Sequence, residues 1–386
     1  MPYPIENKLV IAVASSALFD LSDSDKVYRE KGIGAYRKYQ RKKENVTLRP
    51  GVAFALVRRL LRLNDGYSEI AAPVEVVLLS RNDPDTGLRV VNSIEKHQLG
   101  MSRAVFVSGK NPFRYMNALN ASLFLSANVT DVRKAVEGGL PAGRVFPTSF
   151  TDNQEDLELR IAFDFDGVVA DDSSETVFKR KGLSAFQQSE ADHALEPLRA
   201  GPLARFFREI SRLQHLEREK KKKHTRYLPR LRTAIITARN APAHKRVVAT
   251  LRSWGIEVDE VFFLGGIAKN RVLEEFKPHI FFDDQLKHIE GVAGATPSAH
   301  VPFGIANELS PDLAKKAHAE SIWAKTRGTE LLTNRRPEKV AAPKAKRSHG
   351  SASLDISTKR CRHKTHKHPE RPVRPPSPSP TPGRRA

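Results

Sequence analysis

The chain has 386 residues, 39% of them hydrophobic, which is enough for two domains that each bury a core. The formal net charge is +21, but more than half of this excess lies in residues 335–386, which hold 15 lysines and arginines against 3 acidic residues. The charge therefore does not by itself indicate a nucleic-acid-binding fold. The single cysteine, Cys361, excludes an intramolecular disulfide, and no apolar run is long enough to span a membrane. We expect a soluble, cytoplasmic protein.

Short runs of β-branched and aromatic residues alternate along the chain with longer stretches in which apolar residues recur at helical spacing. Strands that alternate with helices indicate parallel β-α-β units and a doubly wound sheet. Eight runs are expected to form strands: 9–13, 74–79, 104–107 and 122–125 in the first half, and 160–163, 233–236, 261–264 and 279–282 in the second. The clearest helical spacing lies at 52–61 and 203–213.

The two halves of the chain resemble each other. Ile11-Ala-Val-Ala-Ser-Ser-Ala aligns with Ile161-Ala-Phe-Asp-Phe-Asp-Gly at an offset of 150 residues, and Leu78-Leu-Ser aligns with Ile235-Ile-Thr at an offset of 157. Further blocks follow in the same order, so we infer an internal duplication. The expected organisation is two tandem α/β units with doubly wound parallel sheets at 1–150 and 151–310, a helical segment at 311–334, and a disordered, basic, Pro-rich tail at 335–386.

Two carboxylates, Asp164 and Asp166, directly follow the expected strand at 160–163, and Gly167 comes next. Side chains two residues apart on a continuing strand point the same way, so these carboxylates repel each other unless a cation lies between them. A hard divalent cation with oxygen ligands would relieve the repulsion. Taken alone, the Asp-x-Asp motif is better explained as a capping pair at a strand-to-helix loop.

Four further polar residues, Thr237, Lys269, Asp283 and Asp284, also follow expected strands. Ligands of doubly wound sheets bind outside the carboxyl ends of the strands, so one site can contain all of them. Each residue alone has an ordinary structural explanation as a cap, a surface lysine or a helix N-terminus. In this order, however, the residues resemble the four motifs of haloacid dehalogenase-type phosphotransferases.

That resemblance implies a division of labour among the residues. Asp164 would attack phosphorus and form an aspartyl phosphate, and Asp166 would act as general acid and base. Thr237 and Lys269 would bind the phosphoryl oxygens. Mg²⁺ would be held by Asp164, by the backbone carbonyl of Asp166 and by one residue of the pair Asp283 and Asp284, and the sequence leaves open which one.

Longer strings make the resemblance more specific. The segments 30–40, 251–260 and 278–285 are similar to the cytosolic type I 5′-nucleotidase family of the haloacid dehalogenase-like superfamily, within a similarity that runs from about residue 9 to 304. The resemblance implies hydrolysis of nucleoside 5′-monophosphates, with AMP, IMP or deoxynucleotides as substrates. The two tandem units would then both be haloacid dehalogenase-like. The basic tail has no counterpart in this family.

The first copy lacks every carboxylate that the chemistry needs. At the positions aligned with Asp164, Asp166, Asp283 and Asp284 it has Ala14, Ser16, Ser126 and Ala127. We therefore expect a catalytically silent domain. Its strand-end crevice retains polar groups, among them Lys110, that would bind part of the substrate or a regulatory nucleotide; the alternative is a purely structural role.

Residues 171–231 lie between the first two motifs and are expected to form a helical cap over the substrate. The charged run at 217–232 within them is interpreted as a solvated surface loop. No feature of the sequence indicates which nucleobase the site prefers. Arg239 is a candidate substrate ligand, and Phe178 and Phe186 are further pocket candidates, although a core position is the favoured interpretation for these aromatic residues.

Two other functions stay open. One is a related phosphatase for another small phosphomonoester. The other is a nucleic-acid-binding protein with an incidental phosphatase fold, which the basic tail and the four-lysine run 220–223 would favour. The tail is expected to make a weak, salt-sensitive contact with polyanions. The sequence leaves a homo-oligomer open.

Overall fold

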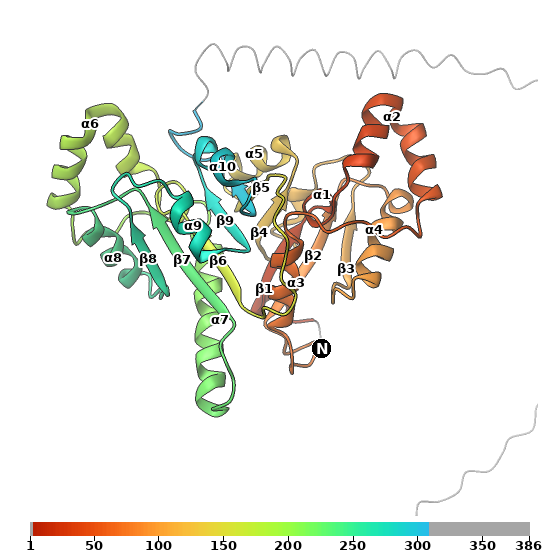
Figure 1. Cartoon of the computed structure of the whole chain (residues 1–386), viewed down its shortest axis with the longest axis horizontal. Helices are drawn as coiled ribbons and strands as arrows, with labels where there is room; N and C mark the ends of the chain where they lie inside the picture. Colours follow the sequence, from red (N-terminus) through yellow and green to blue (C-terminus); the bar gives the residue numbers. More distant parts are fainter. Residues whose placement is uncertain (1–2, 309–386) are drawn as a thin grey trace, which may run out of the picture. The chain divides into compact units, whose positions relative to one another are not determined.

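The computed structural model describes residues 3–308, so the predicted helical segment at 311–334 and the predicted tail at 335–386 lie outside the described residues. Ten strands form a single sheet in the described part (Figure 1). The strands are β1 (Leu9–Val13), β2 (Val74–Ser80), β3 (Arg103–Phe106), β4 (Ala121–Ser126), β5 (Ala142–Val145), β6 (Leu159–Phe163), β7 (Leu231–Thr237), β8 (Glu260–Phe263), β9 (Ile280–Asp283) and β10 (Ser298–His300).

The strand order shows an internal correspondence. It is β3-β2-β1-β4-β5-β10-β9-β6-β7-β8, so the second half repeats the order of the first from the opposite edge. All neighbours pair in parallel except β5 and β10, which meet antiparallel at the centre. The eight predicted strands are confirmed to within two residues. The expectation of separate parallel sheets is wrong, because the short strands β5 and β10 join the halves into one mixed sheet.

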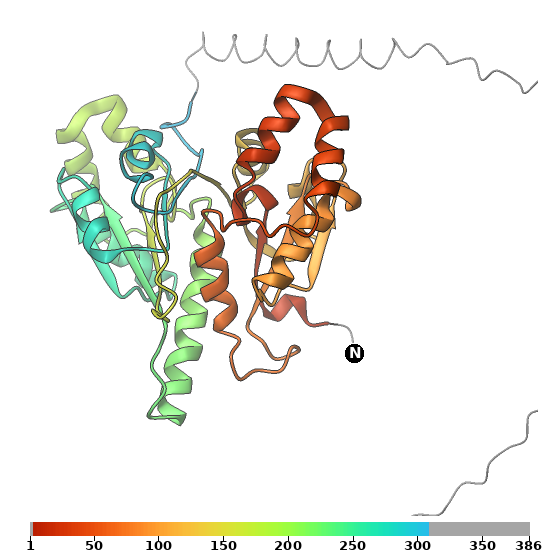
Figure 2. The same ribbon diagram turned by 45° about the vertical axis from the view of Figure 1, so that its right-hand side comes forward.

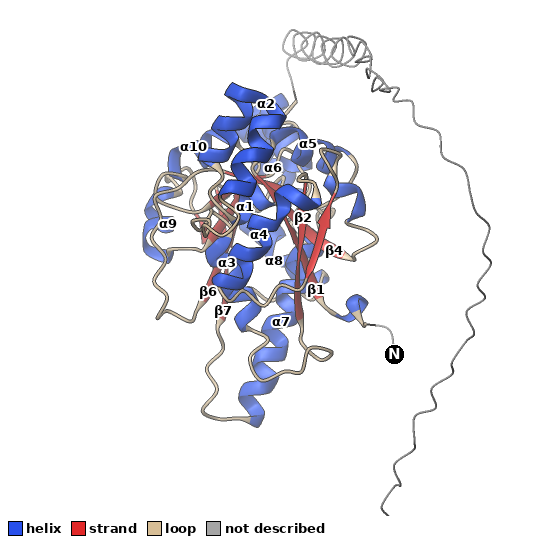
Figure 3. Cartoon of the chain, turned by 90° about the vertical axis from the view of Figure 1, so that its right-hand side faces the viewer, coloured by secondary structure: helices blue, strands red, loops and turns tan. Residues whose placement is uncertain are grey.

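The helices pack on both faces of the sheet (Figure 3). They are α1 (Ser15–Leu18), α2 (Ser22–Lys42), α3 (Phe54–Arg62), α4 (Pro84–Lys96), α5 (Val129–Glu137), α6 (Ser173–Asp192), α7 (Ala204–Lys223), α8 (His244–Ser253), α9 (Asn270–Phe276) and α10 (Leu286–Val292), with short 3-10 turns η1 (Ile5–Asn7) and η2 (Pro112–Tyr115). In the described residues, no helix combines the length and the apolar character that a membrane span needs.

Helices α2 and α6 occupy equivalent places in the two halves, and each is bent into two arms (Figures 1 and 2). The bends lie at Gly32, with φ 74°, and at Gly182, with φ 82°. Glycine adopts these left-handed backbone angles without the steric cost that a side chain adds. The bend lets α6 return toward the strand ends, so that its last turn lies close to the Asp-x-Asp motif.

The charged run at 217–232 differs from its prediction as a surface loop. Helix α7 continues through it to Lys223, and the projecting end of α7 is visible in Figure 1. The carboxylate of Glu217 is buried and accepts hydrogen bonds from the Tyr227 hydroxyl at 2.6 Å and from the backbone N–H groups of Arg230 and Leu231 at 2.9 and 2.8 Å. These bonds fix the chain where it returns to β7, so the run is half helix and half a hydrogen-bonded connection.

The core lies on both faces of the sheet. Alternate residues of β1 enter different clusters: Ile11 packs with residues of α3 and α7, whereas Val10 packs with Val132 of α5. Both faces of the strand are fully buried, as expected for parallel strands covered by helices. Beneath the second strand-end crevice, Phe163 stacks on Phe282 with ring centroids 5.3 Å apart. This packing holds β6 and β9 side by side.

His279, just before β9, gives the fold an acid sensitivity. It is buried, and its Nδ1 accepts the backbone N–H of Arg160 at 2.9 Å. Burial, reinforced by Arg59 and Arg160, lowers the pKa of His279 to about 3. Between an unfolded-state pKa near 6.5 and this value, only the unfolded chain binds the proton, so this group destabilises the fold as pH falls, by up to about 1.4 kcal/mol per pH unit.

We expect His279→Gln, whose amide oxygen can accept the same hydrogen bond, to flatten the dependence of Tm on pH between about pH 6.5 and 4. Thermal unfolding of the two proteins across this range measures the difference. Parallel curves for wild type and variant would show that His279 is not the residue responsible.

Candidate active site

The carboxyl ends of β6, β7 and β9 bring together residues that are far apart in the sequence. The backbone N–H of Asp164 donates to the carbonyl of Phe282 at 2.7 Å, which places the end of β6 beside the end of β9. Lys269 reaches in from the start of α9. Its Nζ lies 2.6 Å from Asp164 Oδ2 and 2.7 Å from Asp283 Oδ2. Three of the predicted site residues therefore form one buried cluster, as expected from their positions after the strands.

Burial governs the charges of this cluster. It raises the pKa of Asp164 to about 7, against the opposing effect of the Lys269 ammonium and with a contribution from the charge of Asp283. For Lys269, burial disfavours the ammonium, but the two carboxylates outweigh it and raise its pKa. For Asp283, burial acts against ionisation, and Lys269 and His288 outweigh it and lower the pKa. The lysine and Asp283 are thus held as a charged pair.

Asp284 is also buried, but unlike Asp164 and Asp283 it has no charged partner within residues 3–308. Both of its carboxylate oxygens are buried and have no hydrogen-bond partner among the described residues. Burial, together with the charges of Asp164 and Asp283, raises the pKa of Asp284 well above its usual range. The carboxylate packs against Gly167, where a Cβ atom would lie 2.5 Å from Asp284 Oδ2 and where φ is +70°. Glycine is therefore required at 167.

An unpaired buried carboxylate needs a cation or a proton. Asp164, Asp283 and His288 also offer ligand atoms that lie within 4.8 Å of one another. These residues fit a divalent metal site rich in oxygen donors. The sequence reasoning did not single out His288, whose Nδ1 lies 3.2 Å from Asp283 Oδ2. Its position five residues after the aspartate, on the helix that follows the strand, is the signal that could have revealed it.

Thr237 ends β7 and is buried. Its hydroxyl accepts the backbone N–H of Arg239 at 3.2 Å, a turn that directs the following loop over the strand end. Arg239 Nε and Nη2 then donate to the two carboxylate oxygens of Asp166 at 2.7 and 2.6 Å. Its Nη1 donates to Glu190. The guanidinium predicted to bind substrate is thus engaged on all three nitrogens by protein groups.

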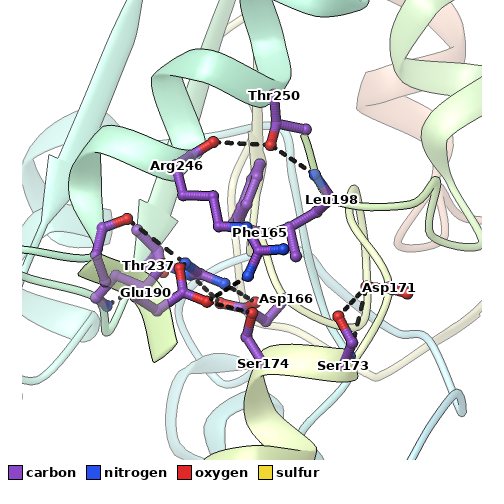
Figure 4. A network of polar contacts seen from close by, with 12 residues as sticks. Phe165, Asp166, Asp171, Ser173, Ser174, Glu190, Leu198, Thr237, Arg246 and Thr250 are labelled. Atoms are coloured by element: carbon purple, nitrogen blue, oxygen red, sulfur yellow. Dashed lines mark hydrogen bonds and ion pairs between the residues drawn. The ribbon is translucent and has the colours of Figure 1, made fainter. Parts of the chain in front are cut away.

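Figure 4 shows how this network continues from Asp166 and Glu190 to Ser174 and Arg246. Burial disfavours the guanidinium charge of Arg239, but Asp166 and Glu190 outweigh it and raise its pKa. The sequence reasoning missed Glu190 and Arg246. The alignment of the two halves is the signal that could have revealed them, because it places polar residues at both positions in each half: Gln40 aligns with Glu190, and Arg89 aligns with Arg246.

Phe178 and Phe186 lie on α6, with their ring centroids 6.1 Å apart. The favoured interpretation of both as core residues is wrong for Phe178, whose side chain is 46% exposed, and Phe186 is half-buried.

The equivalent crevice of the first half is a cavity of about 550 Å³ at the ends of β1, β2 and β4. The residues aligned with the four carboxylates, namely Ala14, Ser16, Ser126 and Ala127, all line it. Lys110 lies in the exposed loop after β3 and is not part of the cavity wall. The structure therefore brings Asp164, Lys269 and Asp283 together in one half and places Lys110 apart from them.

Comparisons with known proteins identify the family of the chain. A model of the family described as 5′-nucleotidase matches residues 1–308. The chain is 37% identical over 297 residues to human cytosolic 5′-nucleotidase 1B, and the match covers 75% of this chain and 48% of that protein. The chain thus spans about half the length of this curated relative. No solved structure matches it significantly. With the family match covering the described residues, the chain belongs to the 5′-nucleotidase family.

Proposed function

We propose that the chain is a Mg²⁺-dependent 5′-nucleotidase that hydrolyses nucleoside 5′-monophosphates to a nucleoside and phosphate. The observation that carries the proposal is the buried cluster in which Lys269 joins Asp164 to Asp283, beside the unpaired carboxylate of Asp284. A nucleophile, a phosphate-binding cation and a metal ligand are the groups that phosphoryl transfer requires. The family membership supports a nucleotide as the substrate.

Asp164 is positioned to act as the nucleophile. Its Oδ1 accepts the backbone N–H of Phe165 at 2.7 Å and its Oδ2 contacts Lys269, so the carboxylate is fixed directly after the carboxyl end of β6. In the first step an oxygen of Asp164 bonds to phosphorus, the bond from phosphorus to the ester oxygen breaks, and Asp166 gives its proton to that oxygen. In the second step water bonds to phosphorus, the acyl phosphate bond breaks, and Asp166 takes up the proton.

Lys269 and the hydroxyl of Thr237 bind the phosphoryl oxygens, where negative charge must be stabilised. Asp164, the backbone carbonyl of Asp166 and Asp284 are the residues that would hold Mg²⁺, because Asp283 is already engaged by Lys269 and His288. When bound, the ion neutralises charge on the phosphoryl oxygens.

The two halves are proposed to be tandem haloacid dehalogenase-like units, a silent one at 1–150 and a catalytic one at 151–310. The mirrored strand order supports this division. In the expected insertion at 171–231, α7 packs against β1, β4 and β7 and belongs to the core. Helix α6, the first part of the insertion, serves as the cap. Its exposed Phe178, paired with Phe186, provides an aromatic surface for the nucleoside.

A phosphate-release assay on the full chain tests the proposed function. With Mg²⁺ present, we expect release from AMP, IMP and their deoxy counterparts, and loss of release after chelation with EDTA and its return when Mg²⁺ is added again. Sugar phosphates are the control substrates. Faster release from sugar phosphates than from every nucleotide would favour a phosphatase for another small phosphomonoester, and no release from either class would contradict both.

A further inference from the structure

A chain of four charged side chains leads from helix α6 to the second aspartate of the Asp-x-Asp motif. Glu190, on the last turns of α6, is buried and accepts hydrogen bonds from Ser174 Oγ at 2.7 Å and from Arg246 Nη1 at 3.0 Å (Figure 4). It also pairs with Arg239, whose other two nitrogens hold both oxygens of Asp166. Asp166 is thus oriented by Arg239, and Arg239 is anchored by Glu190.

The first half contains the same chain in a nearly neutral form. At the positions aligned with Asp166, Glu190, Arg239 and Arg246 it has Ser16, Gln40, Asn82 and Arg89. Arg89 Nη1 donates to Gln40 Oε1 at 3.3 Å, and Gln40 Nε2 donates to the Tyr36 hydroxyl at 3.0 Å. That hydroxyl donates to Asn82 Oδ1 at 3.1 Å. The bent helix α2 is therefore tied to the strand end by hydrogen bonds between neutral groups, and Arg89 adds one charged donor.

The two halves differ in charge at the positions that tie the bent helix to the strand ends. Both halves use the same layout of helix and strand end. At the four aligned positions the first half has only one charged member, Arg89, and the ion pairs that also tie α2 to the start of α4, Arg37–Asp83 and Arg41–Asp85, lie at other positions. Burying a carboxylate and a guanidinium costs desolvation energy that good pairing at best offsets. At the aligned positions, the carboxylate and the guanidinium occur only in the half that has the aspartates, which favours a role for Glu190 and Arg239 in the reaction rather than in the fold.

We propose that Glu190 is a positioning residue for the reaction. It fixes the guanidinium of Arg239, and Arg239 orients Asp166. To carry the proton that it transfers to the leaving oxygen, Asp166 gives up one of its two hydrogen bonds to Arg239 and keeps the other. Glu190 lies on the same helix as Phe186, whose ring centroid is 5.6 Å from the guanidinium carbon of Arg239. The position of Asp166 is therefore coupled to the helix that carries the proposed nucleoside surface. This inference rests on the proposed phosphatase activity.

The first test compares substrates with different leaving groups. For Glu190→Gln, we expect kcat on a nucleoside monophosphate to fall about 10- to 100-fold with KM changed less than about threefold, because part of the general-acid contribution is lost. p-Nitrophenyl phosphate has a leaving group that departs without a proton, so its kcat should fall less than about threefold. Glu209→Gln, at a half-buried position of α7 where the carboxylate also pairs with an arginine, Arg212, is the matched control. Equal losses on both substrates would overturn the proposal.

The second test asks whether Glu190 acts through Arg239. In an Arg239→Asn background, which has the residue found at Asn82, we expect Glu190→Gln to change kcat less than about twofold, because interacting residues are not additive. Multiplicative losses in the double variant would overturn the proposal. If Glu190→Gln alone does not fold by circular dichroism, Glu190→Gln/Arg246→Gln keeps the charges balanced and must show the same difference between the two substrates.

The outcomes also separate this inference from the function on which it rests. Absence of phosphate release by the wild type would remove the proposed function itself. Normal release by the wild type, with full retention of nucleotide turnover in the Glu190 variants, would leave the proposed function in place and overturn only the role of Glu190.

Discussion

Asp164→Asn is expected to abolish phosphate release, with a loss of at least about 10³-fold in kcat, because an amide cannot form the acyl phosphate. The fold should survive the change. Asparagine has nearly the same volume, and its amide oxygen can still accept the backbone N–H of Phe165 at the place of Oδ1, 2.7 Å away in the wild type. Steady-state assays with a nucleoside monophosphate, together with circular dichroism, measure both expectations.

The first half, which we propose to be catalytically silent, provides the control for this experiment. Ser16 lies at the position aligned with Asp166 and lines the equivalent crevice. We expect Ser16→Ala to leave kcat within about twofold, because Ser16 lies on α1 in the other half, where its hydroxyl accepts the backbone N–H of Ala127. Retention of more than a tenth of wild-type activity in Asp164→Asn would contradict the aspartyl-phosphate mechanism, and a large loss in Ser16→Ala would show that the first half takes part in turnover.

The strands and the reactive cluster could be predicted from local patterns. Runs such as 160–163 are short and apolar and end in polar residues, and parallel strands bring those ends to one edge. The strands β5 and β10 could not be predicted in this way. Ala142–Val145 contains a glycine and an arginine, and Ser298–His300 has one apolar residue in three, so their pairing depends on the meeting of the two halves.

The partners of Arg239 could not be predicted from local sequence patterns either, for a different reason. Glu190 precedes it by 49 residues and reaches it only because α6 bends at Gly182 and returns to the strand ends. A candidate substrate ligand was therefore predicted from the position of Arg239 after a strand, whereas the structure surrounds its guanidinium with carboxylates. The repeat did contain the information, because Gln40 and Asn82 align with the same pair, but a neutral pair does not indicate that its counterpart is an ion pair.

Asp284→Asn is expected to separate the metal site from the rest of the cluster. The unpaired carboxylate is the described group best suited to need a cation, so the variant should lose at least about 100-fold in kcat at saturating substrate, as expected when charge stabilisation in the transition state is removed. Asp283 keeps its pairs with Lys269 and His288 in this variant, so the loss reports on the metal position and not on the lysine.

Thermal unfolding gives a readout of the same site that does not depend on turnover. Mg²⁺ should raise the Tm of the wild type, since a ligand present at about 100 times its Kd stabilises the native state by about 2.7 kcal/mol. In Asp284→Asn this rise should disappear. Without Mg²⁺ the variant should be at least as stable as the wild type, because a buried neutral amide without a partner costs less than a buried carboxylate. KCl at matched ionic strength controls for screening. An equal Mg²⁺-dependent rise in Tm for both proteins would place the ion elsewhere and assign Asp284 no part in holding it.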